Sequence, residues 1–490
     1  MFLLLCIATI TANAQIERPK LVVGLVVDQM RWDYLYYYHD DFSNDGFKRL
    51  LREGFSCENT MINYVPTITA VGHTSLYTGS VPALHGICGN DFMLNGKKTY
   101  CCSDTTVTGI GSDTKNARMS PRKMLANTIG DQLHLFTDYR AKVIGVALKD
   151  RAAILPAGHS ADAAYWYDTK VGHFVTSSYY TDRFPKWVDQ FNRKNNTKPG
   201  FDIKTSNQGV TMTFKMAEAA LKNEKLGKGE DTDMLCVSIS STDAIGHEYS
   251  TRGKENYEVY MQLDKDLGNF LKTLDKEVGE GNYLLFLSAD HGASHNPYQL
   301  QDHNIPGGYV DMRELCQLTN EHIKKVMKIN ENVFARDLVY DLVLDWNVID
   351  RLHLDEDKVK AEAVKFLRRQ PHIINAFDID KIGYAPIPEV LRERIANGHM
   401  FGRSGDVTVI VDPSHFTWKL ADDYMGTTHG AWNPYDAHIP LVFFGWHIKP
   451  GQTSTPTYIV DAAPTICELL HMQMPNSCVG NAIECIVNPK

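Results

Sequence analysis

The 490-residue chain has 43% hydrophobic and 22% charged residues, a composition typical of a globular protein rather than of a disordered or fibrous one. Its formal net charge is -9, and lysine and arginine are dispersed along the chain, which excludes a basic face for a nucleic acid polymer. The length allows either about three domains or one large domain with insertions.

The first residues, MFLLLCIATITANAQ, form an apolar stretch that ends in small residues at Ala12-Asn13-Ala14. This pattern is typical of a secretory signal peptide, and the stretch is shorter than the ~20 apolar residues that cross a bilayer. We therefore expect residues 1–14 to be a signal peptide. The mature protein, residues 15–490, is expected to be a periplasmic monomer without a transmembrane segment.

Of the ten cysteines, Cys6 falls in the signal peptide, and none shows the C-x-x-C spacing of a metal or redox motif. The others allow one or two disulfides, for which Cys101-Cys102 and the C-terminal cysteines are candidates. The sequence does not fix their pairing.

Short runs that are apolar at nearly every position recur along the chain, at residues 21–27, 142–148, 234–240, 283–289, 407–411 and 439–445. Runs of this length are typical of strands buried on both faces. Apolar residues at helical spacing lie between them, as at Tyr260, Leu263 and Leu267. The alternation predicts an α/β fold with a parallel-rich central sheet covered by helices on both faces.

Two segments interrupt this rhythm and are expected to be insertions into a single domain. Near residues 90–105, Asn95-Gly96 lies between two β-prone runs, which predicts a hairpin. Residues 305–405 carry charged helical patterns and are expected to form a subdomain or cap.

Acidic and imidazole side chains follow three of the predicted strands. Asp28 comes directly after the first run, Asp290 and His291 directly after the fourth, and Asp243 and His247 shortly after the third. Because the carboxyl ends of parallel strands meet at one edge of a sheet, these side chains are expected to lie close together.

Carboxylates crowded in this way repel one another, and a divalent cation removes that cost. Aspartate and histidine without a thiolate suit Zn²⁺. Asp243 and His247 are one helical turn apart, so both could face one ion. His429 and His438 each offer a further imidazole.

The segment PTITAVGHTSLYTGSVPALHGICGND, residues 66–91, is rich in hydroxyl side chains. The chain has no G-x-S-x-G nucleophile elbow and no P-loop. A metal ion can activate a hydroxyl without an adjacent base, so one of the threonines or serines in 67–80 is the candidate nucleophile.

Together these motifs resemble the alkaline phosphatase superfamily, most closely its PafA-type, phosphate-irrepressible bacterial members. The similarity covers nearly the whole mature chain and includes VVDQMRWDYL, KDRAAILPAGHSADAAYWYD, SSTDAIGHEYS, SADHGAS and THGAWNPYDAHIPLVFFG. The resemblance implies two zinc ions per chain, one held by Asp243, His247 and His429 and the other by Asp28, Asp290, His291 and the nucleophile Thr69.

The resemblance also implies that Asn90, Lys149 and Arg151 contact the phosphoryl oxygens. The remaining histidines of these motifs, His73, His85, His159 and His438, are then expected to have packing or hydrogen-bonding roles. Enterobacterial-type relatives add a Mg²⁺ site through extra carboxylates and an Asp-Ser-Ala nucleophile motif, neither of which is apparent here. No third Mg²⁺ site is therefore expected.

Charge counting favours a monoester substrate. Two zinc ions balance three carboxylates and one alkoxide, and Lys149 and Arg151 then leave a double positive charge that a phosphomonoester dianion would neutralise. The predicted function is an exported zinc-dependent phosphomonoesterase that acts on small-molecule phosphate monoesters through a phospho-threonine intermediate.

Two alternatives stay open. One is a nucleotide pyrophosphatase/phosphodiesterase of the same superfamily, and the other is a non-catalytic protein that only binds zinc or phosphate. A sulfatase is disfavoured because neither C-x-P-x-R nor S-x-P-x-R occurs.

Overall fold

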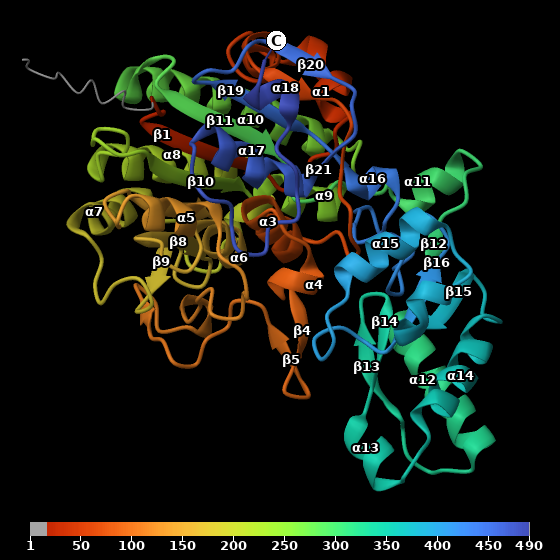
Figure 1. Ribbon diagram of the computed structural model, residues 1–490. Coiled ribbons are helices and arrows are strands. Elements are labelled where there is room, and N and C mark those ends of the chain that lie inside the picture. The colour runs from red at the N-terminus through yellow and green to blue at the C-terminus, as the bar shows by residue number, and fades with distance from the viewer. Residues whose placement is uncertain (1–16, 490) are drawn as a thin grey trace, which may run out of the picture.

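The computed structural model describes residues 17–489, so the predicted signal peptide lies outside the described residues. Its centre is a 10-stranded sheet in the order β20-β2-β19-β11-β1-β10-β7-β8-β9-β6 (Figure 1). The strands are β1 (Leu21–Val27), β2 (Phe55–Cys57), β6 (Gly109–Ile110), β7 (Val143–Ala147), β8 (Ala163–Asp168), β9 (His173–Ser177), β10 (Asp233–Ile239), β11 (Tyr283–Ser288), β19 (Leu441–Gly445) and β20 (Gly451–Thr453).

The middle of this sheet, β11-β1-β10-β7-β8, is parallel, as predicted. Every residue of β1, β10 and β11 is buried, which explains why these strands are apolar at nearly every position. Strand β1 lies between β10 and β11, with Val27 opposite Ile239 and Val26 opposite Ser288. The three strands that precede the acidic side chains are therefore adjacent and end at the same edge.

Helices cover both faces of the sheet, again as predicted (Figure 1). Helix α6 (Asp150–Ala157) packs on β7 and β10 and against α3 (Thr69–Thr78), whereas α8 (Asn207–Asn223) packs on β10 together with α10 (Lys254–Leu274). Further helices are α1 (Tyr34–Tyr37), α2 (Phe47–Glu53), α4 (Pro82–His85), α5 (Ile129–Phe136), α7 (Lys186–Asn195), α9 (Ser241–Tyr249), α11 (Pro297–Asp302), α16 (Pro434–Ala437), α17 (Ala462–Leu469) and α18 (Glu484–Val487).

Two of the predicted strands differ from expectation. Residues 407–411 form β16 (Val407–Val411), which belongs to a separate antiparallel sheet in the order β13-β14-β16-β15, not to the central sheet. Strand β19 is in the central sheet but runs antiparallel to β11 and β2. An unbroken apolar run indicates burial on both faces, and burial specifies neither the sheet nor the strand direction.

The second sheet forms a subdomain with the helices of the 305–405 segment (Figure 1). It has its own apolar core, in which Met312, Ile323, Val359 and Leu367 pack against Val409. Its elements are α12 (Met312–Met327), β13 (Phe334–Leu338), β14 (Asp341–Leu344), α13 (Trp346–Arg351), α14 (Glu356–Leu367), β15 (Ile373–Asp378) and α15 (Glu389–Gly398). The remaining short strands form separate small sheets, β12 with β17 and β3 with β18 and β21. They are β3 (Thr60–Met61), β12 (Gly308–Tyr309), β17 (His415–Phe416), β18 (His438–Ile439) and β21 (Thr457–Tyr458).

The predicted hairpin is present as β4 (Asp91–Leu94) and β5 (Lys97–Tyr100), paired antiparallel. Its turn residues Asn95 and Gly96 have φ of 52° and 72°, the positive values that a two-residue hairpin turn requires.

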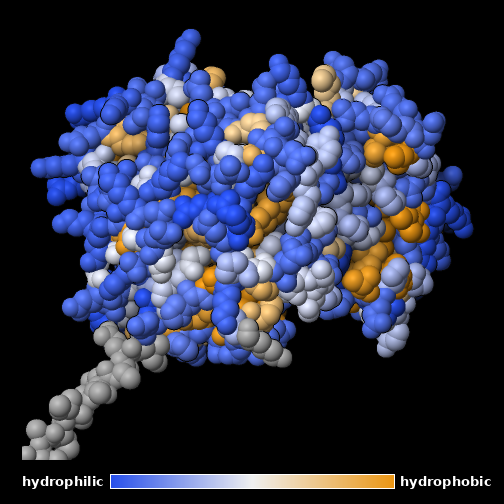
Figure 2. All heavy atoms as spheres, turned by 90° about the horizontal axis from the view of Figure 1, so that it is seen from above, coloured by the Kyte–Doolittle hydropathy of each residue, from blue (hydrophilic) through white to orange (hydrophobic). Residues whose placement is uncertain are grey.

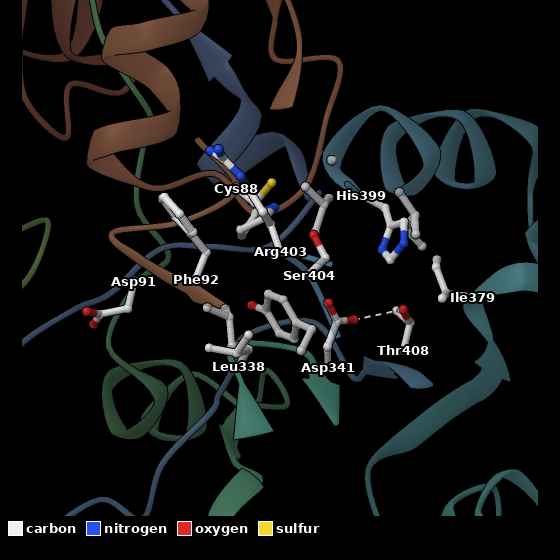
Figure 3. A pocket seen from close by; sticks show the side chains of 16 residues that line it. Cys88, Asp91, Phe92, Leu338, Asp341, Ile379, His399, Arg403, Ser404 and Thr408 are labelled. Carbon is white, nitrogen blue, oxygen red and sulfur yellow. Dashed lines mark hydrogen bonds between the residues drawn. The ribbon is translucent and has the colours of Figure 1, made fainter. Parts of the chain in front are cut away.

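The start of this hairpin, with the residues just before it, and the subdomain line a small cavity of about 40 Å³ (Figure 3). Phe92 and Cys88 line it from one side, and Asp341, which accepts a hydrogen bond from Thr408 at 2.8 Å, lines it from the other. Arg403 of the subdomain donates to the carbonyl oxygens of Gly86 and Lys123. The subdomain thus supports the chain on either side of Asn90.

The nine cysteines in residues 17–489 are all unpaired, so the disulfides allowed by the sequence are not formed there. Most are buried, as small apolar side chains usually are. Within the same residues, no helix combines the length and apolarity needed to cross a membrane. The face in Figure 2 is mainly hydrophilic, with small separate hydrophobic patches.

Helix α3 approaches the end of β11 so closely that only glycine is accommodated at Gly72. A Cβ there would lie 2.1 Å from the carbonyl oxygen of Asp290. We expect Gly72→Ala to lower the free energy of unfolding by about 1–3 kcal/mol or more, because backbone must move to relieve the overlap. Denaturant unfolding measures the free energy of unfolding of the wild type and of the variant. Gly383→Ala is the control, since a Cβ at Gly383 meets no atom within 4 Å. Equal stability of the two variants would contradict the close approach.

Candidate active site

Thr69 is the first residue of α3 and is almost completely buried at the edge where β1, β10 and β11 end. Its Oγ1 lies 3.4 Å from Nε2 of His291. The helix ends at Gly79, whose φ of 64° is the left-handed conformation that commonly closes a helix. Because Thr69 is the first residue of α3, its hydroxyl lies at the helix N-terminus, where backbone N–H groups favour an anion.

Asn90 is positioned by the same helix end. Its Oδ1 accepts a hydrogen bond from the backbone N–H of Ala70 at 3.0 Å, which satisfies one of the free N–H groups of α3. With the oxygen used in this way, the Nδ2 group is left to donate to a ligand beside Thr69.

One group of candidate metal ligands consists of Asp28, Asp290 and His291, all fully buried. Nε2 of His291 lies 3.5 Å from Oδ1 of Asp28 and 3.4 Å from Oδ2 of Asp290. Those two carboxylate oxygens are buried and accept no hydrogen bond. Nδ1 of His291 donates to the carbonyl of Gly292 at 2.9 Å, which leaves the lone pair on Nε2.

A second group consists of Asp243, His247 and His429. As predicted, Asp243 and His247 lie one turn apart, on helix α9, and Nε2 of His247 is 3.1 Å from Oδ1 of Asp243. His429 reaches the same oxygen at 3.5 Å. Both histidines donate Nδ1–H to a backbone carbonyl at 2.8 Å, to Thr427 and Thr67 respectively. All three ligand histidines therefore present Nε2 to carboxylates.

The two groups are in contact. The imidazole rings of His291 and His429 stack with centroids 3.4 Å apart. The ammonium of Lys149 donates to Asp28 at 2.6 Å and also to Asp243, so it lies between the two groups. The structure thus brings together all the residues that the resemblance assigned to the two metal ions.

Burial of so much charge shifts the pKa values of the site. Burial and repulsion from Asp243 and Asp290 raise the pKa of Asp28 well above its usual range. Burial acts in the same direction on Asp243, but His247 and Lys149 hold its pKa well below that range. Burial lowers the pKa of His291 to about 3, so its imidazole is neutral. Three carboxylates cannot all ionise here without additional positive charge.

Divalent cations fit this requirement. The first group offers two carboxylate oxygens without hydrogen bonds, on Asp28 and Asp290, and burial lowers the pKa values of His291 and His429, which favours imidazoles with a free lone pair. Together with Asp243 and His247 these side chains form a donor set that suits Zn²⁺. The backbone carbonyls behind each histidine are the outer contacts that usually orient such ligands.

Arg151 lies beside Lys149 at the start of α6, and its side chain is directed to the hairpin. Its Nη1 donates to the hydroxyl of Tyr100 at 3.2 Å, and its buried Nε has no hydrogen-bond partner. Tyr100 in turn donates to Asp150 at 2.7 Å. A donor that is buried without a partner is available to a ligand.

The four histidines expected to have packing or hydrogen-bonding roles make different contacts, and His73 lies beside a candidate metal ligand. His73 bonds to the carbonyl of Thr69 and to Ser238, and its Nδ1 lies 3.2 Å from Asp290. His438 stacks on Trp32 and contacts the carbonyl of Glu58. His85 bonds to Ser75, and His159 contributes its carbonyl to Tyr179.

Sequence reasoning missed two residues that hold the ligands in place. Gln29 donates its backbone N–H to Asp290 and its Nε2 to Asp243, at 3.1 and 2.7 Å, and so connects the two groups. Its position directly after Asp28 was a signal that could have identified it. Asp436 accepts hydrogen bonds from Gly430 and Ala431 at 3.0 and 2.8 Å and so fixes the loop of His429.

Comparison with known proteins finds relatives that span nearly the whole chain. Residues 22–432 match the family described as type I phosphodiesterase / nucleotide pyrophosphatase. The chain is 43% identical to a protein of Myroides odoratus named calcium-transporting ATPase, over 97% of this chain and 96% of that protein. It is 40% identical to alkaline phosphatase PafA of Elizabethkingia meningoseptica, over 96% and 94% of the two chains. The crystal structure of wild-type PafA matches with a TM-score of 0.92 at 40% identity, covering 97% of this chain and 100% of that one.

The carboxyl of Asp436 gives a prediction about stability. Burial raises its pKa to about 8, so the folded protein favours the protonated form. The stabilisation is complete below the unfolded pKa of about 4 and is lost as the pH rises to about 8. Asp436→Asn keeps an acceptor for Gly430 and Ala431 and should remove this part of the pH dependence. Asp436→Ala should cost about 1–3 kcal/mol, because two buried N–H groups lose their acceptor.

Denaturant unfolding at several pH values between about 4 and 9 measures both effects. The same pH dependence in the wild type and in Asp436→Asn would contradict the raised pKa.

Proposed function

Because this chain belongs to the type I phosphodiesterase / nucleotide pyrophosphatase family and is an alkaline phosphatase of the PafA type, we propose that it uses two zinc ions and a phospho-threonine intermediate to hydrolyse phosphate monoesters. The observation that carries this proposal is the position of Thr69. Its buried hydroxyl lies 3.4 Å from a candidate ligand histidine, beside two groups of carboxylates and imidazoles.

The zinc ions would be held by the ligands that the resemblance assigned, Asp243, His247 and His429 in one group, and Asp28, Asp290, His291 and Thr69 in the other. Bound zinc would supply positive charge that favours the alkoxide of Thr69, activates water and stabilises the leaving oxygen. Without such charge, the buried carboxylates would not all ionise.

In the first step Thr69 loses its hydroxyl proton, Oγ1 joins to phosphorus, and the bond between phosphorus and the oxygen of the leaving alcohol breaks. The alcohol departs as an alkoxide and takes up a proton. In the second step water attacks the phospho-threonine, which restores the threonine hydroxyl and releases inorganic phosphate. Backbone groups hold the three histidines and Asp290 in place, whereas Lys149 and Gln29 hold the carboxylates of Asp28 and Asp243.

Asn90, Lys149 and Arg151 are assigned to the non-bridging phosphoryl oxygens. Asn90 is beside Thr69 through the N–H of Ala70, Lys149 lies between the two ligand groups, and Arg151 has a buried Nε without a partner. A loose phosphoryl-transfer transition state spreads charge over these oxygens, so three donors around them lower the barrier.

A nucleotide phosphodiesterase is the second candidate, because the description of the matching family names that activity. A diester carries one negative charge at phosphorus and a monoester dianion carries two. The adjacent cations Lys149 and Arg151 favour the dianion.

The signal peptide predicted at residues 1–14 supports a periplasmic location. We expect the mature protein to act there on small phosphate esters.

The nucleophile is tested by a matched pair of substitutions. Thr69→Ala should abolish turnover of an aryl phosphate monoester by removing the attacking oxygen, and Thr69→Ser should retain activity because it keeps the hydroxyl. Zinc content, measured by elemental analysis, should stay near two ions per chain in both variants. Wild-type rates in Thr69→Ala would refute the assignment, and loss of activity on treatment with EDTA checks the requirement for metal.

Substrate class is tested by kcat/KM on an aryl phosphate monoester and on the matching diester. The wild type should prefer the monoester. Lys149→Ala and Arg151→Ala should each reduce kcat/KM for the monoester by about tenfold or more and affect the diester less, because a dianion gains more from each cation. A diester preference in the wild type would favour the phosphodiesterase instead.

A further inference from the structure

A cavity of about 480 Å³ lies beside the residues assigned to the phosphoryl group. Lys149, Asp150 and Arg151 at the start of α6 form one wall. The other walls come from the end of the hairpin, from the short helix Lys115–Ala117, from β8 and from the short helix Ile203–Thr205. Its volume is in the range of small-molecule binding sites.

The position of the cavity connects it with the reaction site. Strands β7 and β8 are parallel neighbours, so their carboxyl ends lie at the same edge as those of β1 and β10. The short helix that carries Lys204 packs against α9, the helix of Asp243 and His247. A substrate with its phosphoryl group at Arg151 could therefore extend into this space.

The cavity is positively charged. Its lining includes Lys115, Lys149, Arg151 and Lys204, but Asp150 is the sole carboxylate among the lining residues. Asp150 already accepts a hydrogen bond from Tyr100 and lies 3.9 Å from Arg151.

The two outer lysines have little compensating charge. Within residues 17–489, no carboxylate lies within ion-pair distance of Lys115, and Lys204 has only the half-exposed Asp202 at 3.5 Å. Both ammonium groups are therefore available to an anion in the cavity.

Part of the lining is apolar. Trp166 is buried and donates its indole N–H to the carbonyl of Asn116, so its polar atom is already satisfied. Leu148 and Met119 also contribute. This surface suits the carbon skeleton of a ligand, whereas the lysines suit a charged group attached to it.

We propose that this cavity is a substrate subsite for a second phosphoryl group, carried on the part of the phosphomonoester that is not transferred. The proposal rests on the proposed phosphomonoesterase function. One phosphoryl group would react at Thr69, and the other would contact Lys115 and Lys204. Lysine is a common point-charge ligand of phosphate, and several cations are needed to balance a second dianion.

The subsite is tested with fructose 6-phosphate and fructose 1,6-bisphosphate, which differ by one phosphoryl group. The ratio of kcat/KM for the bisphosphate to that for the monophosphate is measured by phosphate release in the zinc-loaded protein. Lys115→Ala and Lys204→Ala should each lower this ratio by about fivefold, the effect of one partly solvated ion pair. Neither should change kcat/KM for fructose 6-phosphate. Lys265→Ala, which removes an exposed lysine of α10 outside the cavity, is the control and should leave the ratio unchanged.

In the wild type the preference for the bisphosphate should also shrink as ionic strength rises, because partly solvated charges are screened. An unchanged ratio in both lysine variants would overturn the proposed subsite. No phosphate release from either substrate would instead overturn the proposed function, so the two failures can be distinguished.

Discussion

The repulsion among Asp28, Asp243 and Asp290 is the constraint on which the rest of the site depends. These carboxylates are buried where three adjacent parallel strands end, and burial there raises the pKa of Asp28. The negative charge remains tolerable only beside cations and fixed donors. Lys149 supplies one cation, and the two ligand groups can accept divalent ions that supply more.

The surrounding structure positions these groups through the backbone. Each ligand histidine donates to a carbonyl, and Gln29 connects the two ligand groups through Asp243 and Asp290. The close packing of α3 on β11 at Gly72 sets the separation between Thr69 and His291. The subdomain holds the chain around Asn90 through Arg403. The ligand histidines, Asp290 and Asn90 therefore depend on main-chain contacts, which side-chain identity alone does not reveal.

Sequence reasoning predicted those features that arise from local pattern. It identified the buried strands β1, β10 and β11, the helix α10 and the Asn95-Gly96 hairpin, because burial periodicity and turn chemistry are encoded over a few residues. It misplaced β16 and could not give the direction of β19, because both depend on contacts between segments far apart in the chain. Asp436 was missed for a different reason: its partners Gly430 and Ala431 are close in sequence, but no residue pattern predicts the turn that directs their N–H groups to its carboxylate.

The sequence by itself determined the residue types of the site and the strand ends that carry them, since Asp28, Asp290 and His291 directly follow apolar runs. Only the tertiary structure decided which strands are neighbours, which nitrogen each histidine presents and where Lys149 lies between the two ligand groups. It also decided that the cavity beside Arg151 is lined by cations from four separate positions. The physical reason is that strand order and side-chain contacts between distant segments are set by packing of the whole chain, whereas residue type and local periodicity are read from neighbours in sequence.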